Sequence, residues 1–235
     1  MTQFQQRALV LITIWILVVG VHFRRSTPVL IGGLLAVALY ATIEVVRGTV
    51  SISELGLIGG EMSWLWTFAY ALVWLVLMLA YGPLADRIAT RIVATPPTLG
   101  AFRAIQQSRA KLIAGIVVAW ILGGFLEELV FRGIVLKSVE LLAWDWVAGP
   151  TGIVIAICVA AAGAGVIHLY QGPRAAIIIT QLSVLFGVLF VISGYNLWAV
   201  MLCHGMYDTI AFIRFANKKS KYSKLDSDRG TVARA

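Results

Sequence analysis

Long, uninterrupted apolar stretches constrain the fold of this chain more than any other feature of its sequence. Of the 235 residues, 60% are hydrophobic and only 13% are charged, whereas roughly a quarter of the residues in a soluble domain are charged. A helix satisfies its own backbone hydrogen bonds, so a continuous apolar stretch can cross lipid in this form. A membrane β-barrel would instead show short segments of alternating polarity. The sequence therefore predicts an all-α fold, a polytopic transmembrane helical bundle.

Seven stretches are long enough, or nearly so, to cross a bilayer as helices of about 20 residues. We place them at Ala8–Val21, Val29–Val46, Trp64–Tyr81, Leu112–Leu136, Thr151–His168, Ala175–Ser193 and Leu197–Phe215. Between the third and fourth stretches, Leu84, Ile88 and Ile92 recur at helical spacing, with arginines on another face. This pattern favours an interfacial amphipathic segment over a plain linker.

The distribution of basic residues predicts how these spans are oriented. With a cytoplasmic C-terminus, the inside segments contain Arg24, Arg25, Arg87, Arg91, Arg103, Arg109, Lys111, Arg174, Arg214, Lys218, Lys219, Lys221, Lys224, Arg229 and Arg234. The outside segments contain only Arg7, Arg47 and Lys137. The positive-inside rule therefore predicts an odd number of spans, with the N-terminus outside and the C-terminus inside.

The same sidedness accounts for the formal net charge of +8, so we expect no nucleic-acid partner. Residues 217–235 are polar and basic, which favours a disordered tail held near anionic lipid headgroups. Cys158 and Cys203 fall inside apolar stretches and are interpreted as small buried hydrophobes, not as a disulfide. Short loops around one compact bundle favour an integral protein of a prokaryotic cytoplasmic membrane.

Six ionisable residues fall at the depth of the bilayer, where a charge costs a few kcal/mol and marks a functional site. They are Glu127, Glu128, Arg132, His168, His204 and Asp208. Glu128 and Arg132 stand four residues apart, so on a helix they share a face and can form an ion pair. Glu127 points about 100° away, which leaves it free to face a cavity as an ionised general base. A purely structural ion-pair cluster is the alternative.

The histidines stand on two other spans. His168 follows a run of small residues that permits close helix packing, and Gly172-Pro173 ends its helix. His204 and Asp208 stand four residues apart, so the carboxylate can orient the imidazole and set its tautomer. Two glutamates, two histidines and an aspartate on three separate apolar helices together indicate a functional site.

These motifs are similar to those of a known family. Glu127-Glu128-x-x-x-Arg132, the later His168 and the final His204-x-x-x-Asp208 resemble the CAAX-protease and bacteriocin-processing family. Its members include the type II CAAX prenyl endopeptidases and bacterial Abi-type membrane proteins. The resemblance covers about Leu112–Phe215 and implies an intramembrane endopeptidase. It departs at Ala164, where the family usually has phenylalanine.

The resemblance implies a role for each glutamate and for the first histidine. Glu127 would be the catalytic glutamate and, with His168, would activate a water molecule to attack the scissile carbonyl. Glu128 and Arg132 would support that site. The substrate would be a membrane-anchored or hydrophobic peptide, and no cofactor would be required.

The last motif would stabilise the oxyanion through His204 and Asp208. The family often has asparagine in place of Asp208, and an ionised aspartate cannot donate a hydrogen bond to an oxyanion. Asp208 would therefore be protonated, orient His204, or bind a metal.

Three alternative functions remain open from the sequence. Zinc could be bound by His168, His204 and Glu127, which would make the protein a membrane metalloprotease. A non-catalytic immunity or chaperone-like membrane protein would keep the polar cluster for structure. A proton-coupled transporter also places glutamate and histidine at mid-membrane.

This interpretation divides the chain into four parts: N-terminal transmembrane helices (1–82), a cytoplasmic amphipathic linker (83–111), catalytic core helices (112–216) and the basic tail (217–235). With straight spans, Glu127 would lie near mid-membrane, His204 towards the outer half and His168 towards the cytoplasmic end. We therefore expect that the helices are tilted, or broken near Gly163 and Gly165, if the three residues are to meet.

Overall fold

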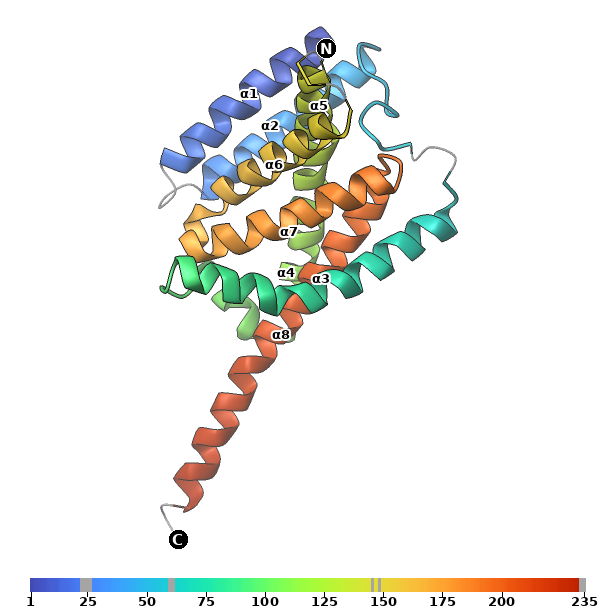
Figure 1. The fold of residues 1–235 in the computed structure, drawn as a ribbon. Helices are drawn as coiled ribbons and strands as arrows, with labels where there is room; N and C mark the ends of the chain where they lie inside the picture. Colours follow the sequence, from blue (N-terminus) through green and yellow to red (C-terminus); the bar gives the residue numbers. More distant parts are fainter. Residues whose placement is uncertain (22–26, 59–61, 145, 148, 233–235) are drawn as a thin grey trace.

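The computed structural model describes residues 1–21, 27–58, 62–144, 146–147 and 149–232, with side chains described as far as Asn217 apart from Ala101. These residues form helices joined by turns and short loops, without a strand in the described ranges (Figure 1). The helices are α1 (Gln3–Val21), α2 (Thr27–Val46), α3 (Trp64–Ile92), η2 (Gly100–Gln106), α4 (Arg109–Ala119), η3 (Trp120–Glu127), η4 (Leu129–Leu136), α5 (Lys137–Trp144), α6 (Pro150–Ile167), η5 (Leu169–Gln171), α7 (Pro173–Ile192) and α8 (Leu197–Val232).

Six helical stretches in the described ranges are long and apolar enough to cross a membrane. One of them, Arg109–Trp144, is a continuous rod built from α4, η3, η4 and α5, and it is called the central rod below. The seventh expected span, Leu197–Phe215, forms the first part of α8 and carries polar side chains among its apolar residues. The all-α polytopic bundle predicted from the sequence is confirmed.

The segment expected to be amphipathic is divided between two helices. α3 continues through Pro83 as far as Ile92, and the short helix η2 follows after an extended stretch. The Phe102 ring of η2 packs on the Phe212 ring of α8, with 5.5 Å between centroids. η2 therefore packs directly on α8 near Phe212.

One end of the bundle gathers the loop after α2 and the start of α8. The backbone N–H of Leu197 donates to the Gly56 carbonyl (3.0 Å), and Trp198 Nε1 donates to the Leu57 carbonyl (2.6 Å). Lys137 Nζ of the central rod donates to the Glu54 carbonyl. These contacts define what we call the Glu54 end.

The other end gathers the segments after α3 and α6. The backbone N–H of Thr98 donates to the Gln171 carbonyl (2.7 Å), and Arg174 forms a bidentate ion pair with Asp86 (2.7 and 2.8 Å). We call this the Arg174 end. Since α1 begins beside Glu54 and α8 leaves beyond the Arg174 end, the chain crosses between the ends an odd number of times.

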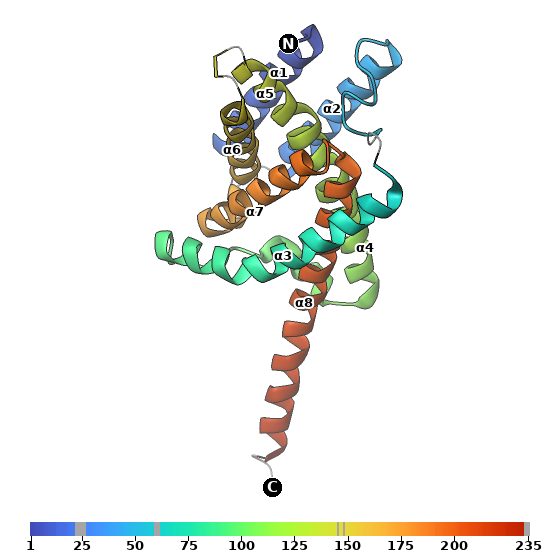
Figure 2. The ribbon, with the colours of Figure 1, turned by 45° about the vertical axis from the view of Figure 1, so that its right-hand side comes forward.

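Crossing helices, not straight parallel ones, bring the expected site residues together. α6 and α7 pack side by side and lie obliquely across the central rod (Figures 1 and 2). α6 runs unbroken through Gly163 and Gly165, and a Cβ on Gly165 would collide with the Thr180 hydroxyl of α7. Tilt and close approach therefore resolve the difference in depth, and a helix break at these glycines is not the explanation.

The C-terminal segment continues the last helix, and the expected disorder of the basic tail stays a prediction. α8 continues as a helix to Val232 and projects away from the bundle (Figures 1 and 2). The basic side chains of this segment, which were expected to contact anionic lipid, lie outside the described residues. The same holds for Arg24, Arg25 and Arg234, which were used to predict the orientation of the spans.

The two ends of the bundle should differ in accessibility from the two sides of the membrane. Cys203 is buried as expected, but Cys158 is exposed, so the prediction that it is buried is wrong. In a Cys158→Ala background, which keeps only the buried native cysteine, we expect Ser53→Cys to react with an impermeant maleimide in intact cells. Gln107→Cys, at the Arg174 end, should react only after permeabilisation. Labelling of both from one side would contradict the odd number of spans, and the reverse pattern would contradict the orientation.

Candidate active site

A fully buried ion pair lies at the middle of the central rod. Arg132 Nη1 donates to Glu128 Oε1 (3.2 Å), and Arg132 Nε lies 3.2 Å from Glu128 Oε2. The side chain of Glu128 is 0% exposed and that of Arg132 is 2% exposed. The pairing expected from their spacing is present, and burial of both charges makes each dependent on the other.

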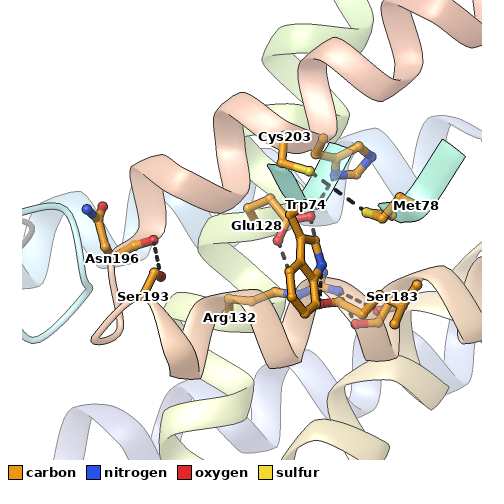
Figure 3. A network of polar contacts seen from close by, with 10 residues as sticks. Trp74, Met78, Glu128, Arg132, Ser183, Ser193, Asn196 and Cys203 are labelled. Carbon is orange, nitrogen blue, oxygen red and sulfur yellow. Dashed lines mark hydrogen bonds and ion pairs between the residues drawn. The ribbon is translucent and has the colours of Figure 1, made fainter. Parts of the chain in front are cut away.

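Arg132 also fixes α7 against the central rod. Its Nη2 donates to the Ser183 carbonyl (2.8 Å) and to the Ser183 hydroxyl (2.6 Å), and Figure 3 shows this side chain reaching across to Ser183. The guanidinium also lies over the Phe186 ring, 5.4 Å from its centroid. The motif did not reveal Ser183 or Phe186, although a serine inside the apolar run of α7 is a polar signal that could have found the first.

Glu128 connects this ion pair to α8. Its Oε1 lies 2.6 Å from His204 Nδ1, and because a carboxylate only accepts, Nδ1 carries the proton. The imidazole stacks on Phe186, with 4.7 Å between centroids, and its Nε2 lies 3.5 Å from Asp208 Oδ2. His204 is thus held from both sides, with its orientation set by Glu128.

Glu127 faces a different partner, the His168 ring at the C-terminal end of α6. Glu127 Oε1 lies 3.8 Å from His168 Nε2, and His168 Nδ1 lies 2.8 Å from the Ala164 carbonyl. Since a carbonyl only accepts, Nδ1 carries a proton, and Nε2 is the ring nitrogen that faces Glu127. The two adjacent glutamates therefore point to two different histidines.

Exposure separates the two halves of this cluster. The side chain of Glu128 is 0% exposed, whereas those of Glu127 and His168 are each 12% exposed and that of Asp208 is 26% exposed. The ion pair is sealed inside the bundle, while Glu127, His168 and Asp208 retain access to a small molecule such as water.

Tyr170 follows His168 in the turn between α6 and α7. Its ring stacks on His168 with 6.0 Å between centroids, and its hydroxyl accepts a hydrogen bond from Gln171 Nε2 (2.9 Å). Burial raises the pKa of Tyr170 to about 12, so the phenol keeps its proton at neutral pH. Sequence reasoning assigned it no role.

Glycines allow α8 to approach the central rod at this point. A Cβ on Gly123 would lie 3.0 Å from Asp208 Oδ2, and one on Gly124 would lie 3.4 Å from the Gly205 backbone. A Cβ on Gly205 would collide with the Trp120 ring. Larger residues would push α8 away and separate His204 from Glu128.

The central rod departs from α-helical geometry around the glutamates. The segments η3 and η4 are π-helical and flank Glu128 on both sides. π-Helical turns are rare and are often found at functional sites. The sequence predicts an angle of about 100° between Glu127 and Glu128, which holds for an ordinary α-helix. The wider π-helical turn was not predicted.

The zinc alternative needs at least three ligands that converge on one point. Among the described residues, no three His, Cys, Asp or Glu side chains are grouped closely enough to hold a metal ion. His168 Nδ1 faces a carbonyl, and His204 Nδ1 is engaged by Glu128. Contacts of this kind also orient metal-binding histidines and leave Nε2 for another partner, so zinc binding stays a hypothesis.

The bundle of apolar helices encloses paired carboxylates and imidazoles. Residues 109–210, somewhat less than half of the chain, match a family model described as type II CAAX prenyl endopeptidase Rce1-like. This matched segment confirms the resemblance drawn from the motifs and supports a peptidase at the level of the family. It runs from the start of α4 into α8 and includes all six expected site residues. No curated protein and no solved structure matches the chain.

The buried ion pair should be revealed by a double-mutant cycle. We expect Glu128→Gln or Arg132→Met alone to lower the free energy of unfolding by about 3–5 kcal/mol, because each leaves one buried charge without its partner. The double variant should lose clearly less than the sum. Unfolding in detergent measures all four proteins, and additivity within about 0.5 kcal/mol would show that the pair is not coupled.

Proposed function

We propose that the protein is an intramembrane endopeptidase in which Glu127 and His168 activate a water molecule to hydrolyse a peptide bond. The observation that carries this proposal is the division between the two glutamates. Glu128 is engaged by Arg132 and His204, whereas the ion-pair partner of Glu127 among the described residues is His168, at 3.8 Å. Glu127 is therefore the carboxylate available to take a proton.

The gap between Glu127 and His168 suits a shared water molecule. Two acceptors 3.8 Å apart can each receive one hydrogen bond of about 2.8 Å from the same water. Polar groups separated by more than a hydrogen-bond length are commonly bridged in this way. The lone pairs of such a water oxygen point away from Glu127 and His168. A substrate carbonyl carbon on that side of the water can therefore be attacked by them.

Proton transfer would follow the order expected for general acid–base catalysis. As the water oxygen forms a bond to the scissile carbonyl carbon, Glu127 takes the water proton and the carbonyl oxygen gains negative charge. The tetrahedral intermediate then collapses, the carbon–nitrogen bond breaks, and the proton passes from Glu127 to the leaving amine. The balanced products are a carboxylic acid and an amine.

His204 would stabilise the negative charge on the intermediate. Its Nδ1–H is directed to Glu128, so a proton on Nε2 would be available to the oxyanion. Asp208, 3.5 Å from that nitrogen, would favour the protonated imidazole and orient it, which removes the need for Asp208 to donate a hydrogen bond. This proposal requires no metal.

The substrate would be a membrane-anchored or hydrophobic peptide. Glu127 and His168 lie in the interior of a helical bundle, so the scissile bond must reach the bundle from the bilayer or its surface. Exclusion of bulk water around the site would strengthen each of these electrostatic contacts.

The proposal predicts that proteolysis depends on both residues. In cells that express the intact protein, we expect new peptide termini in the membrane fraction, detected by mass spectrometry. Glu127→Gln should reduce their yield by at least about a hundredfold, because it removes the general base but keeps the side-chain volume. His168→Ala should have a similar effect.

A matched control is Glu140→Gln, a glutamate of the central rod that bonds to Tyr195 outside the site. It should leave the termini unchanged at equal expression. Unchanged termini in Glu127→Gln would overturn the proposal. Metal analysis of the purified protein tests the mechanism separately, since stoichiometric zinc that restores activity after chelation would favour the metalloprotease.

A further inference from the structure

A groove between α1 and α2 at the Glu54 end lies outside the proposed active site. It has a volume of about 510 Å³, within the range of small-molecule sites. It is lined by two arginines, Arg7 and Arg47, by the apolar side chains of Val10 and Leu11, and by Tyr40 and Glu44. We propose that this groove binds one anionic phospholipid, with its phosphate at the arginines and an acyl chain along the apolar side chains.

The charge of the groove is unusual for its end of the molecule. The sequence assigns only Arg7, Arg47 and Lys137 to the outside segments, and Lys137 is bound to the Glu54 carbonyl. The remaining two arginines line the same groove. A general excess of positive charge at this end therefore does not explain why they lie together.

Glu44 holds one of these arginines in place without neutralising the groove. It is 6% exposed, and its two carboxylate oxygens accept hydrogen bonds from Arg47 Nη1 (3.1 Å) and the Thr49 hydroxyl (2.6 Å). The side chain of Arg47 is still 67% exposed. One carboxylate against two guanidinium groups leaves a net positive charge for an anionic headgroup.

Tyr40 supplies a second, independent observation. Its hydroxyl is buried and has no hydrogen-bond partner among the described residues, and its ring is stacked on Phe4 with 5.5 Å between centroids. Buried hydroxyls without a partner are uncommon and need a reason. A phosphate or ester oxygen of a lipid in the groove would accept this hydrogen bond.

The depth of these residues matches the layout of a phospholipid. Arg7 lies near the start of α1 and Arg47 directly follows the end of α2, which is the level of headgroups for helices that cross the bilayer. Val10 and Leu11 lie one turn deeper and are 59% and 51% exposed. A lipid in the groove would therefore find the arginines at the level of its headgroup and the apolar side chains at the level of its acyl chain.

Photolabelling with lipids that carry a diazirine in the acyl chain tests this site directly. The full chain is reconstituted with photoreactive phosphatidylglycerol or phosphatidylcholine of the same acyl composition, and the labelled peptides are mapped by mass spectrometry. We expect the α1 peptide containing Val10 and Leu11 to be labelled up to about 25-fold more by phosphatidylglycerol. Each arginine contributes roughly a fivefold factor.

Two variants make the result specific to the groove. Arg7→Gln/Arg47→Gln should bring the labelling ratio close to one, and Arg7→Lys/Arg47→Lys should keep most of it because the charge remains. The matched control Arg87→Gln/Arg91→Gln removes two arginines from the Arg174 end and should not change the ratio at the α1 peptide. Both arginines of the groove are exposed, so the bundle does not need them to pack.

Several outcomes would overturn the assignment. Equal labelling by the two lipids in the unchanged protein would mean an ordinary annular lipid. An unchanged ratio in Arg7→Gln/Arg47→Gln would mean that the arginines do not bind it. Loss of labelling when inorganic phosphate is added would indicate a soluble anion, and no labelling by either lipid would indicate that another protein segment fills the groove.

Discussion

The buried ion pair between Glu128 and Arg132 is the interaction on which the rest of the site depends. It neutralises two charges at the centre of an apolar bundle, where either alone would be strongly unfavourable. Arg132 donates from Nη2 to Ser183 of α7, and Glu128 accepts a hydrogen bond from His204 of α8. One pair therefore ties three helices together and orients an imidazole. It also leaves the neighbouring Glu127 outside this ion pair and directed to His168, which is why Glu127 is the carboxylate proposed as the general base.

Close packing makes these contacts possible, and small residues make the packing possible. Gly123 and Gly124 of the central rod meet Asp208 and Gly205 of α8, respectively, and Gly165 of α6 meets Thr180 of α7. In lipid the hydrophobic effect does not drive helices together, so close backbone approach and interhelical hydrogen bonds must stabilise the bundle. The same glycines that stabilise the membrane domain therefore set the distances within the site. Substitutions at these glycines would therefore affect both the stability of the bundle and the geometry of the site.

Most of the architecture could be predicted from the sequence because the bilayer permits few solutions. Apolar stretches of sufficient length must be helices, and the observed spans agree with the expected ones to within a few residues at most ends. The exceptions are instructive. α3 continues into the segment expected to be a separate amphipathic helix, and the central rod continues beyond Leu136 as far as Trp144. The six motif residues also lie close together in the structure, and the sequence singled them out because charge at membrane depth is costly.

The sequence by itself determined that this is a helical membrane protein with a carboxylate and histidine cluster, because both conclusions follow from the cost of polar groups in lipid. Only the tertiary structure decided how that cluster is divided. The spacing indicated that Glu128 pairs with Arg132, but not that Glu128 also binds His204, that Glu127 faces His168, or that Ser183, Phe186 and Tyr170 complete the surroundings. These pairings depend on the tilt of α6 and α7 against the central rod and on its π-helical turns. Both arise from packing between segments far apart in the chain, which no local pattern records.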